Sequence, residues 1–306
     1  MRTARIGTTL GRYRIERELG SGGIGCVYEA VALEDRPEIP RGRRVALKVV
    51  HPHLVLMRPE LRRRLVTELE VGKRVRHENV VHAYEGFATE CEGLPTFAIA
   101  MEFVAGQSLR TVLRAVERVP EARCRDVGRR VAAGLAAIHA AGAVHRDVKP
   151  ENVLVSAGSD GAQLPGPCIV KISDFGVARV LEEVDRVSVL GSFVGSLDYA
   201  APEQFGVGGR DVDHRVDLYA LGLLLYELAS GTRPFPVCDI PGLIACTLRQ
   251  VPPPILNVAP HVSPFFAAVV HVLLRKDPDE RFEDAAHVEQ ILAEGESSRW
   301  WRNRTS

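Results

Sequence analysis

The segment from His145 to Asn152 constrains this chain more than any other part of its sequence. Its order is His-Arg-Asp-Val-Lys-Pro-Glu-Asn, and it lies between an Ala- and Arg-rich stretch and a short apolar run. Asp147 can accept a proton from a hydroxyl group, Lys149 can steady a negatively charged group beside it, and Asn152 can ligate a cation. A charged turn between a helix and a strand is the alternative, but it does not require this order of residue types. The segment therefore predicts a catalytic loop.

Asp174 follows a second apolar run, Ile169–Ile172, and precedes Phe175 and Gly176. A carboxylate at the end of a strand, followed by Phe and Gly, suits a divalent-cation ligand on a movable turn. This tripeptide is common by chance, so the interpretation of Asp174 as a cation ligand depends on the His145–Asn152 segment before it.

Three glycines, Gly20, Gly22 and Gly25, lie between two predicted strands. Glycines let a turn fold tightly and direct backbone N–H groups at phosphate oxygens. A dinucleotide-binding motif has a similar pattern but needs a helix directly after the glycines. Here Val27–Val31 continues as a strand, which favours a hairpin that covers phosphates.

Lys48 ends the apolar run Val45–Lys48. A lysine among apolar residues usually extends its ammonium group to solvent. The alternative is a buried cation that holds phosphate oxygens and needs a carboxylate partner. Glu68 on the following predicted helix can supply one. Glu70 is a competitor that lies about 200° around the helix from Glu68, so both cannot face Lys48.

Short strands dominate the first hundred residues, and helices dominate the rest. The expected strands are Tyr13–Leu19, Val27–Leu33, Val45–Val50, Ala83–Thr89 and Thr96–Glu102. One helix interrupts them at Arg58–Val75. The later helices are expected at Glu121–Ala141, Val216–Ser230, Ile240–Gln250, Ser263–Arg275 and Phe282–Ala293. The Gly-, Ser- and Pro-rich stretch Ser156–Pro167 is expected to be a surface loop.

Length and composition agree with a globular protein of one large or two fused lobes, since the chain has 306 residues. Lys+Arg and Asp+Glu number 39 each, so no overall field favours nucleic acid or an anionic membrane. The six cysteines form no CxxC pair, which excludes a typical zinc site or disulfide framework and indicates a reduced setting. The longest apolar run, Leu221–Leu228, contains Tyr226 and Glu227 and is too short to span a membrane. The tail Arg299–Arg302 is either a partner-docking aromatic patch or, slightly favoured, a linker.

Together these motifs resemble the eukaryotic-like (Hanks-type) protein kinase family. They occur in the family's order over about residues 10–293, and Ser21–Ala30 and Tyr199–Gln204 are most similar to its bacterial Ser/Thr branch. The resemblance implies an α+β, bilobal fold. A small antiparallel β lobe with one key helix would span 10–103 and bind ATP. A larger, mainly α lobe would span 104–293 and carry catalysis and the substrate, with a tail or truncated linker at 294–306.

The resemblance also implies roles for individual residues. Gly20, Gly22 and Gly25 would cover the ATP phosphates, and Lys48 would contact the α- and β-phosphates and pair with Glu68. The adenine would contact Val27, Ala46, the gatekeeper Met101, the hinge Glu102–Val104 and Leu154.

In the larger lobe, Asp147 would be the catalytic base and Lys149 would assist it. Asn152 and Asp174 would ligate Mg2+, with Mn2+ as an alternative metal. Two structural features are also implied. Glu203 would pair with Arg281, and Asp217 would brace the backbone at His145–Arg146. Lys149 between Asp147 and Pro150 would indicate Ser/Thr rather than Tyr acceptors.

The function that the resemblance implies is a cytoplasmic protein serine/threonine kinase that transfers the ATP γ-phosphate to protein Ser/Thr hydroxyls. Its own activation segment would be a substrate, at Ser188 or Ser192, with Ser196 in a structural role. Protein substrates and a homodimer for trans-autophosphorylation are the implied partners, with no nucleic acid and no membrane insertion by this segment. A membrane attachment outside this sequence is compatible with that reading.

Two alternatives remain. A pseudokinase-type ATP-binding scaffold normally loses the equivalents of Lys48, Asp147 or Asp174, and this chain keeps all three. A small-molecule phosphotransferase of related fold usually lacks the Ala-Pro-Glu stretch at Ala201–Glu203 and a Glu203–Arg281 pair.

Overall fold

The computed structural model describes residues 5–57, 59–156, 169–174, 197–206, 212–236 and 239–305. Contacts between backbone positions divide these residues into two compact units. The strand-rich unit contains the described residues up to His77 and Val81–Ala105. The helical unit contains Glu78–Val80 and the described residues from Gly106 onward.

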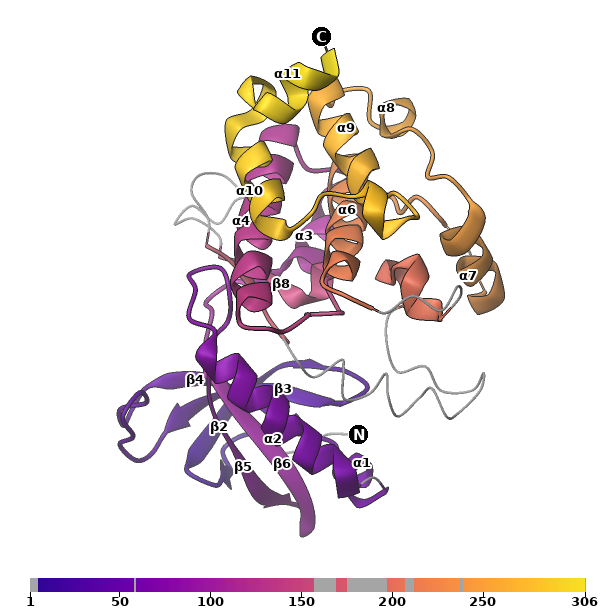
Figure 1. Cartoon of the computed structure of the whole chain (residues 1–306). Helices are drawn as coiled ribbons and strands as arrows, with labels where there is room; N and C mark the ends of the chain where they lie inside the picture. The colour runs from indigo at the N-terminus through magenta and orange to yellow at the C-terminus, as the bar shows by residue number, and fades with distance from the viewer. Residues whose placement is uncertain are drawn as a thin grey trace. The chain divides into compact units, whose positions relative to one another are not determined.

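The strand-rich unit is built on one antiparallel sheet of six strands in the order β1-β2-β3-β4-β6-β5 (Figure 1). All five expected strands are present, and the two-residue β1 is an addition. The strands are β1 (Thr9–Leu10), β2 (Tyr13–Ser21), β3 (Gly25–Ala32), β4 (Arg44–Val50), β5 (Ala83–Cys91) and β6 (Leu94–Glu102).

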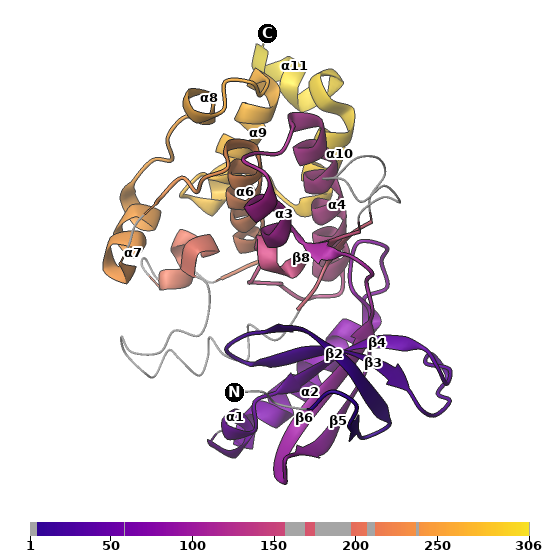
Figure 2. The same ribbon diagram turned by 180° about the vertical axis from the view of Figure 1, so that it is seen from behind.

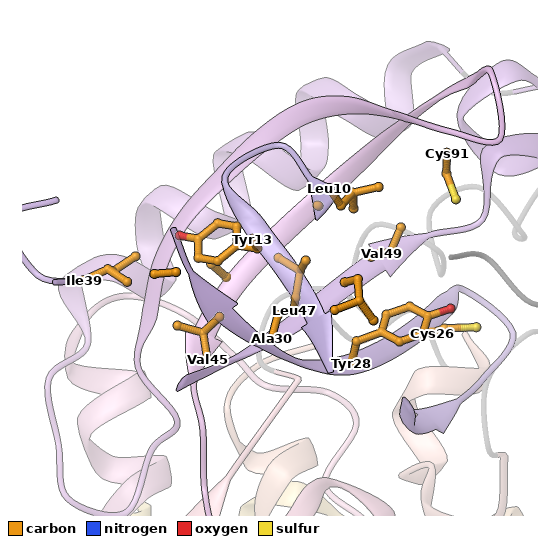
Figure 3. Close-up of a cluster of buried hydrophobic side chains, with 14 residues drawn as sticks. Leu10, Tyr13, Cys26, Tyr28, Ala30, Ile39, Val45, Leu47, Val49 and Cys91 are labelled. Carbon is orange, nitrogen blue, oxygen red and sulfur yellow. The ribbon is translucent and has the colours of Figure 1, made fainter. Parts of the chain in front are cut away.

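Alternation along these strands gives the sheet two apolar faces. One face buries a cluster that includes Tyr13, Tyr28 and Leu47 (Figure 3). The other face packs against helix α2 (Pro59–Arg74), which confirms the helix expected over Arg58–Val75. The contact is close at Gly86, where an added Cβ would lie 2.4 Å from Leu69 Cδ2. Glycine at this position of β5 therefore provides the space that the Leu69 side chain fills.

The helical unit is organised around α6 (Arg215–Ser230), in which all residues from Val216 to Ala229 are buried. This burial explains why its sequence is apolar on every side. Helix α6 contacts α4 (Glu121–Ala140) and α9 (Pro264–Leu273), while α10 (Ala285–Glu294) packs on α4 (Figure 1). The other helices of this unit are α3 (Leu109–Ala115), α7 (Ile240–Arg249), α8 (Ile255–Val258) and α11 (Arg299–Thr305) (Figure 2). The unit also has a small sheet of β7 (Gln107–Ser108), β8 (Val153–Val155) and β9 (Val170–Ile172). The strand-rich unit has one further helix, α1 (Pro52–Met57).

All five helices expected in this part of the chain are present. Helix α10 begins at Ala285 rather than at the expected Phe282, because the Asp284 side chain accepts a hydrogen bond from the backbone N–H of His287 and caps the helix there. The stretch expected to be a surface loop, Ser156–Pro167, lies outside the described residues apart from Ser156. In the described ranges, no helix combines the length and the apolar character needed to cross a bilayer.

The C-terminal tail, expected to be a linker or a docking patch, forms the short helix α11. Its Trp300 and Trp301 rings lie with their centroids 6.3 and 5.7 Å from that of Phe265 in α9, and Trp300 also approaches Phe282 at 5.2 Å. Aromatic pairs at these separations stabilise packing beyond the area that they bury. The two tryptophans thus attach the tail to the helical unit.

Candidate active site

The glycine-rich turn joins β2 to β3, as predicted. The Gly22 N–H donates a hydrogen bond to the Gly25 carbonyl at 2.9 Å and closes the turn. An added Cβ at Gly25 would lie 2.1 Å from the Val49 carbonyl oxygen, so only glycine fits there. At Gly20 and Gly22, no described atom lies within 4 Å of an added Cβ. The turn therefore leaves its backbone open at these two positions, as phosphate binding requires.

Lys48 is buried in β4, with 6% of the residue exposed. Its cross-strand partners are Val27 in β3 and Ile99 in β6, and Ala46 faces Met101. Directly opposed residues of antiparallel strands project to the same side of a sheet. The predicted nucleotide-contacting residues Val27, Ala46, Lys48 and Met101 therefore share the face that carries Ile99, which belongs to the cluster packed against α2.

The partner predicted for Lys48 lies on α2. Glu70 is exposed and its carboxylate pairs with Lys73 at 3.0 Å, whereas Leu65 and Leu69 of the same helix are buried against the sheet. Glu68 follows Leu65 by three positions and therefore lies near this buried stripe. The Glu68 side chain is outside the described part of the structure, so the Lys48–Glu68 pair stays a prediction.

The predicted hinge, Glu102–Val104, begins at the last residue of strand β6. Glu102 is the last residue of β6 and lies opposite Val45. Its N–H donates a hydrogen bond to the His82 carbonyl at 2.8 Å. This bond fixes the backbone where the chain leaves the strand.

The catalytic loop brings Asp147, Lys149 and Asn152 together. Lys149 Nζ lies 2.7 Å from both carboxylate oxygens of Asp147. Asn152 Nδ2 donates hydrogen bonds to the Asp147 backbone carbonyl and to Oδ2, each at 2.8 Å. The Asp147 carboxylate is thus held in one orientation by two donors, while 23% of its side chain stays exposed. A fixed and accessible carboxylate can receive a proton from an incoming hydroxyl group.

Asp217, at the start of α6, holds the backbone of this loop. Its fully buried carboxylate accepts hydrogen bonds from the backbone N–H groups of His145 at 2.8 Å and Arg146 at 2.7 Å, which confirms the predicted brace. A third contact, missed from the sequence, comes from His139 Nε2 at 2.8 Å. Arg146 has φ +65°, a conformation that non-glycine residues seldom adopt. The bonds to Asp217 stabilise that strained backbone.

Asn152 and Asp174 have the chemistry of a divalent-cation site. Asn152 uses its amide nitrogen on Asp147, which leaves Oδ1 as the amide atom for a cation. Its backbone carbonyl accepts hydrogen bonds from Ser173 N at 2.8 Å and Ser173 Oγ at 3.1 Å. These bonds fix the residue before Asp174, which itself has φ +61°. An amide and a carboxylate oxygen suit a hard cation such as Mg2+. Phe175 and Gly176 lie outside the described residues.

Leu154, predicted to lie under the adenine, is in β8 between Ser108 of β7 and Lys171 of β9. It is partly exposed, whereas its neighbours Val153 and Val155 are buried on the other side of the strand. Leu154 is therefore the residue of this strand that remains accessible to a ligand.

Glu203 and Arg281 form the predicted ion pair. Arg281 Nη1 and Nη2 donate to the two carboxylate oxygens of Glu203 at 2.7 and 2.8 Å, and both side chains are almost completely buried. The same guanidinium donates to the backbone carbonyls of Arg215 and Arg275. The pair therefore ties the Ala201–Glu203 stretch to α6 and to the loop after α9.

Replacing Arg281 with Met should destabilise the chain by about 3–5 kcal/mol, because the Glu203 carboxylate would stay buried without its cation. Chemical denaturation followed by circular dichroism measures this loss. Arg275→Met is the matched control: its partner Glu280 lies 3.9 Å away and both side chains are more than half exposed, so it should cost less than about 1 kcal/mol. Equal losses in the free energy of unfolding would contradict the claim that the buried pair matters more for stability than the exposed one.

Sequence reasoning missed a second polar cluster, in which Arg110 contacts the buried Tyr199 and Glu227 and the exposed Glu151. A signal was present in α6. Glu227 lies in the apolar run Leu221–Leu228, and a carboxylate buried in such a helix needs a cationic or hydrogen-bonding partner. The sequence does not say which arginine supplies it.

Comparisons with known proteins agree with this geometry. A glycine-turn sheet with a buried lysine and a helical unit with an aspartate-centred catalytic loop define the protein-kinase class of folds. The model of the family described as "Protein kinase domain" matches residues 13–294. This chain belongs to the protein kinase family, in its bacterial Hanks-type Ser/Thr branch. The family uses ATP with a divalent metal ion.

Two curated relatives and one solved structure illustrate the similarity. The chain is 38% identical over 295 residues to serine/threonine-protein kinase Pkn1 of Myxococcus xanthus, covering 94% of this chain and 38% of Pkn1. It is 36% identical over 300 residues to PknJ of Mycobacterium tuberculosis, covering 96% of this chain and 48% of PknJ. The kinase domain of M. tuberculosis PknI has a TM-score of 0.69 and 26% identity, over 95% of this chain and 98% of that domain. This confirms the expected fold class. The chain spans less than half the length of Pkn1 and PknJ.

Proposed function

We propose that this chain is the catalytic domain of a protein serine/threonine kinase, which transfers the γ-phosphate of ATP to Ser and Thr hydroxyls of proteins. The observation that carries the proposal is the Asp147 carboxylate, held by Lys149 and Asn152 in a loop that Asp217 braces. The named relatives are serine/threonine-protein kinases, which supports the same activity here.

Each residue has a defined part in the transfer. Asp147 takes the proton of the acceptor hydroxyl while the hydroxyl oxygen forms a bond to the γ-phosphorus. The bond from that phosphorus to the bridging β-phosphate oxygen breaks, and ADP leaves. Lys149 stabilises the negative charge on the transferring group. The glycine turn and Lys48 orient the phosphates. A bound divalent cation, which we propose is Mg2+ with Mn2+ as an alternative, supplies further charge neutralisation, and Asn152 and Asp174 would hold it.

The acceptor class and the partners are proposed by analogy with the family. Lys149 lies between Asp147 and Pro150, as expected for Ser/Thr rather than Tyr acceptors. We expect protein substrates and a homodimer in which one copy phosphorylates the other, with the domain acting in the cytoplasm. The pseudokinase alternative has no support in the site, because Lys48, Asp147 and Asp174 are all retained.

The wild-type chain should phosphorylate its own activation segment at Ser188 or Ser192. Both serines, and Ser196, lie outside the described residues. Arg146 lies in the catalytic loop directly before Asp147 and provides a cation for a phosphoserine of the activation segment. Mass spectrometry after incubation with Mg-ATP tests the proposal, with the Asp147→Asn variant as the matched control. The segment should be modified in the wild type alone; a wild-type segment that stays unmodified while other proteins are phosphorylated would contradict the assignment.

A further inference from the structure

His51 directly follows strand β4 and is bonded to the glycine turn by both its backbone and its side chain. Its backbone N–H donates a hydrogen bond to the Ile24 carbonyl at 2.8 Å. Its imidazole Nε2 lies 3.0 Å from the carbonyl oxygen of Gly22. Because a carbonyl oxygen can only accept, Nε2 is the donor of this bond. The middle of the turn is therefore attached to the residue that ends the neighbouring strand.

The elements on either side of His51 fix its position. On one side, His51 lies three positions after Lys48, and Val50 pairs with Gly25 at the end of the turn. On the other side, the His51 carbonyl accepts a hydrogen bond from the Leu54 N–H of α1 at 3.0 Å. Leu54 packs on the apolar cluster that α2 shares with the sheet. The imidazole therefore reaches the turn from a backbone that both β4 and α1 hold in place.

The bond to Gly22 also sets the direction of a hydrogen-bond donor in the turn. In a planar trans peptide the carbonyl and the N–H point in opposite directions. Since the Gly22 carbonyl is turned towards His51, the N–H of Gly23 in the same peptide points to the opposite side. Glycines leave a turn many conformations, and phosphate binding needs the backbone N–H groups in only a few of them. The imidazole disfavours the conformations in which this peptide has rotated.

We propose that His51 is a positioning residue for the ATP phosphates, whose imidazole holds the glycine turn so that the Gly23 N–H and the Lys48 ammonium group face the phosphate oxygens in one arrangement. This inference rests on the proposed kinase function and extends it to a residue outside the turn. The residues predicted to contact adenine, Val27, Ala46 and Met101, lie in the strands of the sheet. His51 therefore acts on the binding of the phosphates and not on that of the adenine.

The test compares His51→Gln with His51→Asn. The amide nitrogen of glutamine is as many bonds from Cβ as Nε2 of histidine, whereas that of asparagine reaches only as far as Nδ1, and both amides are donors. His51→Gln should keep the bond to Gly22 and bind Mg-ADP with a Kd within about two-fold of the wild-type value. His51→Asn should raise that Kd about three- to ten-fold, as expected for the loss of one hydrogen bond. Calorimetry measures both values, and the Kd for adenosine should be the same in both variants and in the wild type.

His53→Asn is the matched control. His53 is exposed, and its ring stacks on that of His51 with the centroids 5.4 Å apart. The change therefore removes an imidazole from the same segment and leaves the bond between His51 and Gly22 in place. This variant should bind Mg-ADP and adenosine with wild-type affinity. The melting temperature of each variant reports on its fold, and kcat/KM for ATP should fall in His51→Asn by the same factor as the affinity for Mg-ADP.

Three results would each overturn the proposal. They are equal affinities of His51→Asn and His51→Gln for Mg-ADP, a loss of adenosine affinity in His51→Asn as large as its loss of Mg-ADP affinity, and an equal loss in His53→Asn. Failure of the proposed kinase function gives a different result, because a wild-type chain that binds Mg-ADP but transfers no phosphate to any protein would overturn that function and leave the binding comparison intact.

Discussion

The Asp147→Asn variant should lose phosphoryl transfer almost completely and still bind Mg-ATP with nearly wild-type affinity. The asparagine amide cannot accept the proton of the acceptor hydroxyl, and the loss of a general base costs about a hundred- to ten-thousand-fold in rate. The contacts of Asp147 are to Lys149, Asn152 and the His145 ring, all within its own loop, and its role is with the acceptor. Calorimetry with Mg-ATP and a kinase assay on the same preparation measure the two properties.

Asp126→Asn is the control for this experiment. Asp126 lies on α4, where its carboxylate pairs with Arg129 and Arg130 and its side chain is 25% exposed, close to the 23% of Asp147. This variant should transfer phosphate at the wild-type rate. Substantial turnover by Asp147→Asn would remove Asp147 from the mechanism.

Replacing Lys48 with Met should lower kcat/KM for ATP by at least about a hundred-fold, because a preorganised, charge-assisted phosphate contact disappears. Lys48 lies buried in β4 between Val27 and Ile99, so the apolar methionine side chain fits the same position without a new cavity. Steady-state kinetics at several ATP concentrations measure the effect, and the melting temperature reports on the fold.

Lys73→Met provides the comparison, since Lys73 is a partly exposed cation of α2 whose ammonium group pairs with Glu70 of the same helix. It should leave the kinetics unchanged. If Lys48→Met phosphorylates an acceptor at wild-type speed, another cation holds the phosphates and the assignment of Lys48 is wrong.

Much of this architecture could be predicted from the sequence because its signals are local. The β-branched and apolar residues of Val45–Val50 predict a strand, and β4 buries them on both faces of the sheet. Residue types in the His145–Asn152 segment are set by the chemistry of the loop, so their order alone predicts a catalytic loop, and the structure adds the contacts of Asp147 with Lys149 and Asn152. The resemblance to a known family then supplied the distant Glu203–Arg281 pair, which no local pattern indicates.

The rest depends on contacts between distant parts of the chain. Arg110 is separated by 41 positions from Glu151 and by 117 from Glu227, and nothing near Arg110 marks it as more than a surface arginine of a short helix. The tail is a similar case. Trp300 and Trp301 look like an exposed aromatic patch until Phe265 and Phe282 are known to lie against them. Short elements such as β1 carry too few residues for a periodic signal.

The most direct test of the proposed activity is the transfer of labelled γ-phosphate from ATP to acceptor peptides that differ only in the acceptor residue. With the wild-type chain and Mg2+, the Ser and Thr peptides should become labelled, the Tyr and Ala peptides should not, and the Asp147→Asn variant should label none. Labelling of the Tyr peptide in preference to Ser and Thr would contradict the acceptor class, and no labelling of any peptide or protein by the wild-type chain would contradict the assignment as a protein kinase.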